Sequence, residues 1–470
     1  MGKAFHQSVR KNFHPCFLGI GFVFAWNVSI TYSASPMFTD AVAVNTLILL
    51  VRAITYVCSA AAYKKAEPLL RNKGFICLCS GLGSVASLVY LLFFNLFGLF
   101  NVFVAIVCAL VIGFTQSCLM LSWYDLFARM SFRELCVYYS AGNVVASVIP
   151  FHLSFVDPGY KLIIAVLPIV GSLLYGMSRK DSILSNMESG REHVELKWSF
   201  PFRPMALMVV TAFIMGCTRF FQVDASLNYS LLGHIVSAAF LLLAAALIPA
   251  RFNLKLLYLF SLPLCIIGLF LSRQMEPFFG IFGAICTNAG LSFFFMFVII
   301  LFCSISYRYG INVIWLIGFA EAMKLIGMLL GNVTGLYLVQ NEAIVSWRLA
   351  ADVAAIVIVI AFTVFLSEKD YRGTWGSMPI DDESAKAPGF AGASNYEMLL
   401  DRCMKISRQY SLTRREEEVL FLLAQNKTVP TIEKELSISN ATAKTHCHHI
   451  YAKLNVHKKK DLIALVQDQN

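Results

Sequence analysis

The sequence predicts an all-α chain: a polytopic membrane helix bundle of about 12 spans in two sets of six, followed by a small four-helix domain. The first observation behind this prediction is composition. The 470 residues are 58% hydrophobic and only 14% charged, which is too apolar for an ordinary soluble protein. The second is that long apolar runs recur up to Leu366, and the third is an abrupt change after it to Gly, Pro, Ser and acidic residues.

The membrane domain is predicted to cover residues 1–366. A bilayer core about 30 Å thick needs about 20 helical residues, so apolar runs of that length between polar or basic breaks predict the spans. They lie at 15–33, 41–63, 75–94, 99–122, 136–156, 160–178, 204–222, 230–249, 254–271, 278–303, 312–336 and 343–366.

The distribution of Lys and Arg predicts the orientation of these spans. One alternate set of loops, with the N-terminus, holds seventeen basic residues, whereas the other set holds two, Lys161 and Arg273. Basic residues accumulate in cytoplasmic loops. We therefore expect a multi-pass protein of the cytoplasmic (inner) membrane with both termini in the cytoplasm.

The longest internal loop, 179–203, is polar and separates six spans from six. This arrangement resembles the major facilitator architecture in span count and loop symmetry. The basic segment "YKKAEPLLRNKG" (63–74) stands where that family carries a loop motif but lacks its glycine-aspartate pattern. The resemblance implies a fold of two six-helix halves.

Ionisable residues within the spans are candidates for a site, because charges at bilayer depth are costly and usually face the bundle interior. Glu321 and Lys324 are three apart, and Arg348 and Asp352 four apart, so each pair shares a helix face. Further candidates are Arg52, Asp125, Arg219 and Asp224, the last three near span ends. Three interpretations stay open: structural pairing between helices, a ligand cavity that includes Glu321 and Lys324, and a proton or ion relay.

No residue pattern indicates catalysis, a cofactor or a metal. Eleven of the 13 cysteines lie in or beside apolar runs and are expected to be buried thiols. The cluster at 446–449 (His-Cys-His-His) occupies consecutive positions, which point around a helix instead of converging on one ion.

The tail divides into a linker, 367–410, and a terminal domain, 411–470. A short amphipathic helix at 396–410 could couple the tail to the membrane part or to a second chain. In the domain, Thr413 and Glu416 form a capping box for a helix at 414–425, which Asn426 could end in a left-handed conformation. Further helices are predicted at 429–436, over about 15 residues after an N-cap at Ser439, and at 460–467.

Four short helices with a tight turn between the second and third are typical of a helix-turn-helix. The segments "LTRREEEVLFLLAQ", "ISNATAKTH" and "IYAKLNV" resemble the LuxR-type DNA-binding domain in order and spacing. The resemblance implies that the third helix reads bases through Lys444, Thr445 and His448. It also implies phosphate contacts and dimer contacts. The residues expected to contact DNA phosphates are Thr442, Lys453, Lys458 and Lys459. The residues expected to contact a second copy of the chain are Leu462, Ile463 and Leu465.

Together these features predict a membrane-embedded one-component transcriptional regulator. Its expected partners are promoter DNA, membrane lipid, an unknown small-molecule ligand, a second copy on DNA, and RNA polymerase if it activates. One alternative is a secondary transporter of major facilitator type with a regulatory DNA-binding tail. Another is a transporter whose basic tail binds anionic lipid.

Overall fold

The structure is a computed structural model, and it describes most of the chain. The described residues are 14–33, 39–97, 101–130, 132–179, 201–221, 224–247, 255–272, 277–340, 347–365, 399, 402–407, 409–425, 427–436, 439–456 and 458–467. The chain forms two compact units, Met1–Ser377 and Met378–Asn470. All regular elements among the described residues are helical, as the sequence predicts.

The first unit is a bundle of long apolar helices that correspond to the predicted spans. Its main elements are η1 (Pro15–Leu18), α2 (Gly19–Ser33), α3 (Thr39–Ala61), α4 (Tyr63–Arg71), α5 (Lys73–Tyr90), η2 (Leu91–Leu96), α6 (Val102–Phe127), α7 (Phe132–Ser154), η3 (Pro158–Val166), α8 (Leu167–Ser178), α10 (Phe202–Thr218), η4 (Arg219–Phe221), α11 (Asp224–Leu247), α12 (Lys255–Ser272), α13 (Pro277–Tyr309), α14 (Val313–Gln340) and α15 (Trp347–Phe365). Among the described residues, 7 helices are long and apolar enough to cross a membrane, and four shorter apolar helices accompany them. The remaining helix of the twelve, α7, is less apolar because it carries Asn143 and His152.

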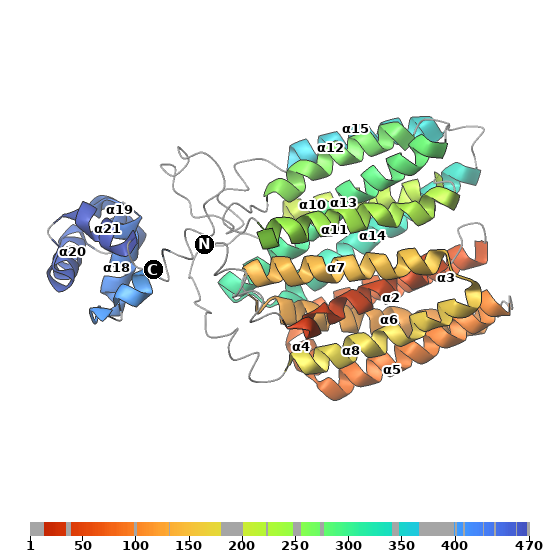
Figure 1. Cartoon of the computed structure of the whole chain (residues 1–470), viewed down its shortest axis with the longest axis horizontal. Helices are drawn as coiled ribbons and strands as arrows, with labels where there is room; N and C mark the ends of the chain where they lie inside the picture. The colour runs from red at the N-terminus through yellow and green to blue at the C-terminus, as the bar shows by residue number, and fades with distance from the viewer. Residues whose placement is uncertain are drawn as a thin grey trace. The chain divides into compact units, whose positions relative to one another are not determined.

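The helices of this unit run side by side in two groups (Figure 1). α2 to α8, coloured red to yellow, form one half, and α10 to α15, green to cyan, form the other. The halves meet where α7 packs on α11 and where α3 packs on α14. Large apolar side chains also point outward, for example Phe103, which is 75% exposed, and Val85, which is 62% exposed. Such an outer surface suits a lipid environment.

Three glycines of α14 form a close contact with α10. Gly327, Gly331 and Gly335 are spaced four residues apart, and a Cβ atom at each would overlap backbone carbonyl groups of α10. Small residues at this spacing let two membrane helices approach closely. The motif is visible in the sequence as "GMLLGNVTG", but apolar run length alone does not reveal it.

The cysteines are free thiols, as expected, but not all are buried. Cys58 and Cys77 are exposed on the outside of the bundle, and Cys217 is half-buried. This corrects the expectation that the thiols of the apolar runs are buried. The outward positions on α3 and α5 face the surface that suits lipid, where a thiol is tolerated as a small apolar group.

The second unit contains α18 (Arg414–Ala424), α19 (Val429–Leu436), α20 (Asn440–Leu454) and α21 (Lys459–Gln467). These bounds agree with the predicted helices to within a residue or so. The capping box of Thr413 and Glu416 is present. Asn426 lies outside the described residues, while Asn455 ends α20 with φ 52°, in the left-handed region.

The core of the second unit extends beyond the segment predicted as a domain. Cys403 and Ile406, in a helical stretch at 402–407, are 0% exposed and pack with Val419, Ile450 and Leu462. Part of the expected coupling helix therefore belongs to the hydrophobic core of this unit. Most of the rest of the predicted linker, 367–398, and most of the central loop, 180–200, lie outside the described residues.

Candidate functional site

Helix α20 presents one polar face and one apolar face. Its N-cap Ser439 accepts a hydrogen bond from the Thr442 N–H at 3.1 Å. Ala443, Cys447 and Ile450 are buried in the core. The predicted base-reading residues are all exposed on the other side, and they are Lys444, Thr445 and His448. The helix can therefore bring these three side chains to a groove edge while its apolar side holds it to the domain.

Glu416 of α18 forms a hydrogen-bonded ion pair with α20. Its Oε2 accepts a hydrogen bond from Lys453 Nζ at 2.7 Å, and the Thr413 N–H donates to the same oxygen at 2.7 Å. Burial by itself would raise the pKa of Glu416, but the hydrogen bonds from Lys453 and Thr413 outweigh it and lower the pKa to about 2. The carboxylate is therefore charged at neutral pH and acts as a structural link.

The turn before α20 is held by a second polar contact. Asn440 Nδ2 donates to Glu433 Oε2 at 2.7 Å, which joins the first residue of α20 to α19. This contact helps to fix the angle between the two helices. In a helix-turn-helix, that angle sets how the recognition helix enters the major groove.

The four residues expected at phosphates differ in their surroundings. Thr442 and Lys458 are exposed. Lys453 bonds to Glu416, and Lys459 Nζ donates to the carbonyl of Lys427 at 2.6 Å. These two lysines therefore have a structural contact already, and phosphate binding at all four positions stays a prediction.

The predicted dimer contacts on α21 also differ. Leu462 is 0% exposed and packs in the core of its own domain, so its side chain is not accessible to a partner. Ile463 and Leu465 are only partly buried, which leaves them as the candidates for a contact between copies. Among the residues that the structure describes, no group of three His, Cys, Asp or Glu side chains comes together as a metal site.

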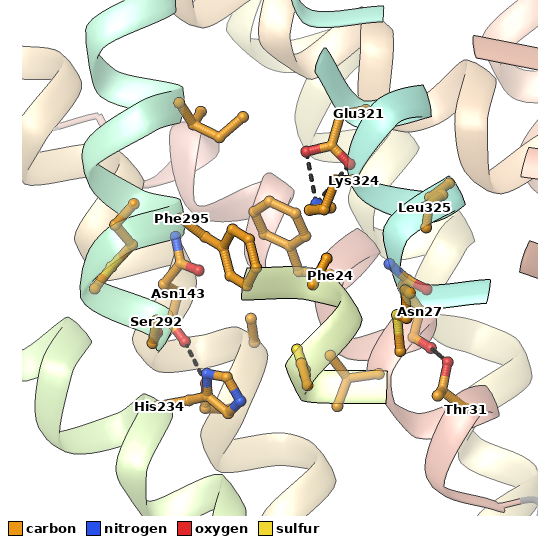
Figure 2. Close-up of a pocket in the computed structure, with 18 of the residues that line it drawn as sticks. Phe24, Asn27, Thr31, Asn143, His234, Ser292, Phe295, Glu321, Lys324 and Leu325 are labelled. Carbon is orange, nitrogen blue, oxygen red and sulfur yellow. Dashed lines mark hydrogen bonds and ion pairs between the residues drawn. The ribbon is translucent and has the colours of Figure 1, made fainter. Parts of the chain in front are cut away.

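The membrane unit contains a cavity of about 210 Å³ between its two halves. Residues of α2, α3, α6 and α7 line it from one side and residues of α10, α11, α13 and α14 from the other. Figure 2 shows Phe24 and Phe295 facing the interior, with Asn143, His234 and Ser292 nearby. Most of the lining is aromatic or aliphatic, with a few polar groups that converge, as in small-molecule sites.

Glu321 and Lys324 line this cavity as an ion pair on α14. Lys324 Nζ lies 2.6 Å from Glu321 Oε2 and 5.5 Å from the centre of the Phe295 ring. Glu321 is 1% exposed. The two residues do share a helix face, and the structure adds that this face lies on the cavity.

Arg52 lines the opposite side of the cavity from α3 and is 5% exposed. Its Nη1 donates to Asn27 Oδ1 at 2.6 Å. Asp352 is half-buried on α15, but the side chain of Arg348 lies outside the described residues. The pairing of Arg348 with Asp352 therefore stays a prediction.

The charged residues near the span ends have other roles. Asp125 is buried and accepts two hydrogen bonds from Arg71, at 2.9 and 2.7 Å, and one from Arg129 at 3.1 Å. Arg219 Nη2 donates to the Thr31 carbonyl at 2.9 Å, which joins η4 to α2. The side chain of Asp224 lies outside the described residues.

One polar contact links the two halves at the end of the bundle that carries α4. Asn312 caps the start of α14, because its Oδ1 accepts from the N–H groups of Ile314 and Trp315 at 3.0 and 3.2 Å. Its amide also donates to Glu67 of α4, which pairs with Arg71. We call the contact between Glu67 and Asn312 the α4–α14 latch.

Sequence reasoning missed several cavity residues. Asn27, Asn143 and His234 are single polar residues within apolar runs, and each is brought to the cavity by helix packing. The available signal was a polar side chain within a predicted span, which marks uncharged residues less strongly than charged ones.

Comparisons with known proteins agree with this division of the chain. Residues 410–466 match the family described as bacterial regulatory proteins, luxR family. The "Uncharacterized response regulatory protein YgeK" of Escherichia coli (strain K12) is 45% identical over 65 residues, which are 13% of this chain and 44% of that protein. The chain thus covers less than half the length of this curated relative.

The membrane unit is similar in fold to a solved transporter. The crystal structure of the human organic anion transporter MFSD10 (TETRAN) matches with a TM-score of 0.52 and 10% sequence identity, over 74% of this chain and 97% of that chain. At this identity, the similarity shows the fold alone. The chain therefore combines a major facilitator-like multi-pass membrane region with a C-terminal LuxR-type helix-turn-helix domain.

Proposed function

We propose that this protein is a membrane-embedded one-component transcriptional regulator. The proposal rests mainly on the exposure of Lys444, Thr445 and His448 on one side of α20. The N-terminus of this helix is capped, and its other side packs in the core of the domain. The bundle in the same chain has a cavity lined by both of its halves. A small molecule in the cavity is the input, and occupancy of promoter DNA is the output.

The proposed membrane topology follows from the charge of the loops. Both termini lie in the cytoplasm, because the basic residues gather on that side, and the helix-turn-helix then has access to chromosomal DNA. Two copies bind the operator, with Ile463 and Leu465 at their contact. If the output is activation, RNA polymerase is the further partner.

Transmission within the bundle is proposed to run along α14. This helix carries Glu321 and Lys324 at the cavity, and Asn312 of the α4–α14 latch lies about 14 Å before Glu321 at the helical rise. A ligand that binds better to one arrangement of the two halves shifts their equilibrium. The latch is expected to close in one arrangement and open in the other.

The test is a genome-wide map of the DNA bound by the full-length protein in its own cells. The control is a double variant, Lys444→Ala with His448→Ala, expressed at the same level in the membrane. We expect discrete peaks beside one or a few operons that disappear in the double variant. Peaks that persist in the variant, or no peaks under any growth condition, would refute the proposal.

The second candidate is a secondary transporter whose tail regulates expression, and the transporter-like fold of the membrane unit favours it. Uptake into proteoliposomes separates the two. A sensor binds its ligand without accumulating it, whereas a transporter accumulates it against a gradient.

A further inference from the structure

The side of the cavity formed by α3 holds a positive charge, on Arg52, that is paired with no carboxylate among the residues that the structure describes. Arg52 sits near the middle of α3 and is 5% exposed. A guanidinium group has five N–H donors. Within the described residues, its Nη1 bonds to the neutral Asn27 amide, its Nε has no hydrogen-bond partner, and no carboxylate lies within ion-pair distance. A buried charge of this kind is costly unless something pairs with it.

The other charges of the cavity do not supply that partner. Glu321 is the one acidic residue in the lining, and it pairs with Lys324 at 2.6 Å. Apart from the imidazole of His234, the lining thus carries two cations and one anion, which leaves one positive charge.

The remainder of the lining limits the shape of a ligand. Phe24, Phe295 and Tyr139 supply aromatic surface. A cavity of about 150 Å³ is enough to hold benzene. A cavity of about 210 Å³ therefore has room for one ring with a small charged group attached.

We infer that the ligand of this cavity is a small organic carboxylate with a single ring, held by an ion pair to Arg52. The carboxylate replaces the missing counter-ion, and the ring packs against the aromatic residues. This inference rests on the proposed sensor function, because it names the class of molecule that the sensor recognises.

The experiment measures binding of benzoate to the purified full-length protein in detergent by isothermal titration calorimetry. Benzyl alcohol, which has the ring without the charge, and acetate, which has the charge without the ring, are the comparison ligands. We expect benzoate to bind at least about tenfold more tightly than either. Equal affinities, or no benzoate binding at millimolar concentrations, would overturn the inference.

Two variants test the role of Arg52 separately. Arg52→Gln removes the charge and is expected to weaken benzoate binding by about 10- to 100-fold, with little effect on benzyl alcohol. Asn27→Asp instead places a carboxylate on Arg52, so it should abolish the preference for benzoate even if Arg52→Gln does not fold. Lys65→Gln, at an exposed site outside the cavity, should bind as the wild type does. Unchanged benzoate binding in Asn27→Asp would contradict the inference.

The same protein separates failure of this inference from failure of the proposed function. If benzoate does not bind but promoter occupancy is specific, the ligand class is wrong and the regulator stands. If benzoate binds as expected but accumulates in proteoliposomes, and no promoter is occupied, the ligand class stands and the sensor function is wrong.

Discussion

Neutralising Glu416 should destabilise the DNA-binding unit in a way that depends on pH. Glu416→Gln keeps the size of the side chain but removes the charge that pairs with Lys453 at 2.7 Å. The pKa of Glu416 is lowered to about 2 in the folded protein. A lowered pKa means that the carboxylate stabilises the fold above its ordinary pKa and stops doing so as the pH falls through the folded value.

The magnitude follows from the size of the pKa shift. Each pKa unit corresponds to about 1.4 kcal/mol, so lowering the pKa from 4.5 to about 2 gives an upper limit of about 3 kcal/mol. Glu416 is 4% exposed, but the side chain of Lys453 is 37% exposed, and solvent screens part of their attraction. We therefore expect Glu416→Gln to lower the free energy of unfolding by about 2 kcal/mol at pH 7.

The assay is urea unfolding of the unit Met378–Asn470, followed by circular dichroism from pH 7 down to pH 2 to 3. This unit has its own hydrophobic core, so it is expected to fold alone. The difference between wild type and Glu416→Gln should shrink as the pH falls from about 5 toward 2, because wild-type Glu416 then becomes neutral as well.

The matched control is Glu418→Gln, on the same helix. Glu418 pairs with Arg415, whose side chain is 56% exposed, so its loss should cost less than about 0.5 kcal/mol. A difference between wild type and Glu416→Gln that does not change with pH, or an equal cost for Glu418→Gln, would refute the reasoning.

Three further predictions concern helix packing, DNA contacts and the buried ion pairs. Gly331→Leu should lower the melting temperature of the full-length protein in detergent, because its side chain would push α10 from α14, whereas Gly81→Leu, with open space around it, should not. Lys458→Ala should weaken DNA binding about equally for all sequences, and it should reduce the slope of the logarithm of the binding constant against the logarithm of salt concentration by about one. Lys444→Ala should instead relax the base specificity at one position of the operator. Asp125→Asn should destabilise the bundle by about 3 kcal/mol, seen as a lower melting temperature, because it removes the buried carboxylate that Arg71 and Arg129 share, and Arg71 keeps only its pair with Glu67. If Asp125→Asn has the melting temperature of the wild type, the ion pairs of Asp125 contribute little to the stability of the bundle.

Local patterns predicted the secondary structure of this chain well. Apolar run length located the membrane helices, and capping residues such as Thr413 and Ser439 located the short helices of the tail. These signals act over a few residues, so a single sequence carries them. The position of Glu321 and Lys324 on one helix face followed from their spacing in the same way.

The contacts between distant segments were not predictable in this way. Arg71 and Asp125 are 54 residues apart, and Glu67 and Asn312 are 245 apart. Only the packing of the helices brings them together. The extension of the tail domain to Cys403 was also missed, because two apolar positions in a polar stretch do not reveal which core they join.

The glycine contact with α10 lies at unequal distances from the cavity residues of α14 and from the start of that helix. Gly331 lies seven residues from Lys324 and nineteen from Asn312, which at the helical rise is about 10 Å and about 28 Å. If α14 tilts by about 10° around Gly331, Lys324 moves by about 2 Å and Asn312 by about 5 Å. A hydrogen bond does not survive a separation of about 5 Å, so a displacement at the cavity smaller than one water molecule would break the hydrogen bond between Asn312 and Glu67.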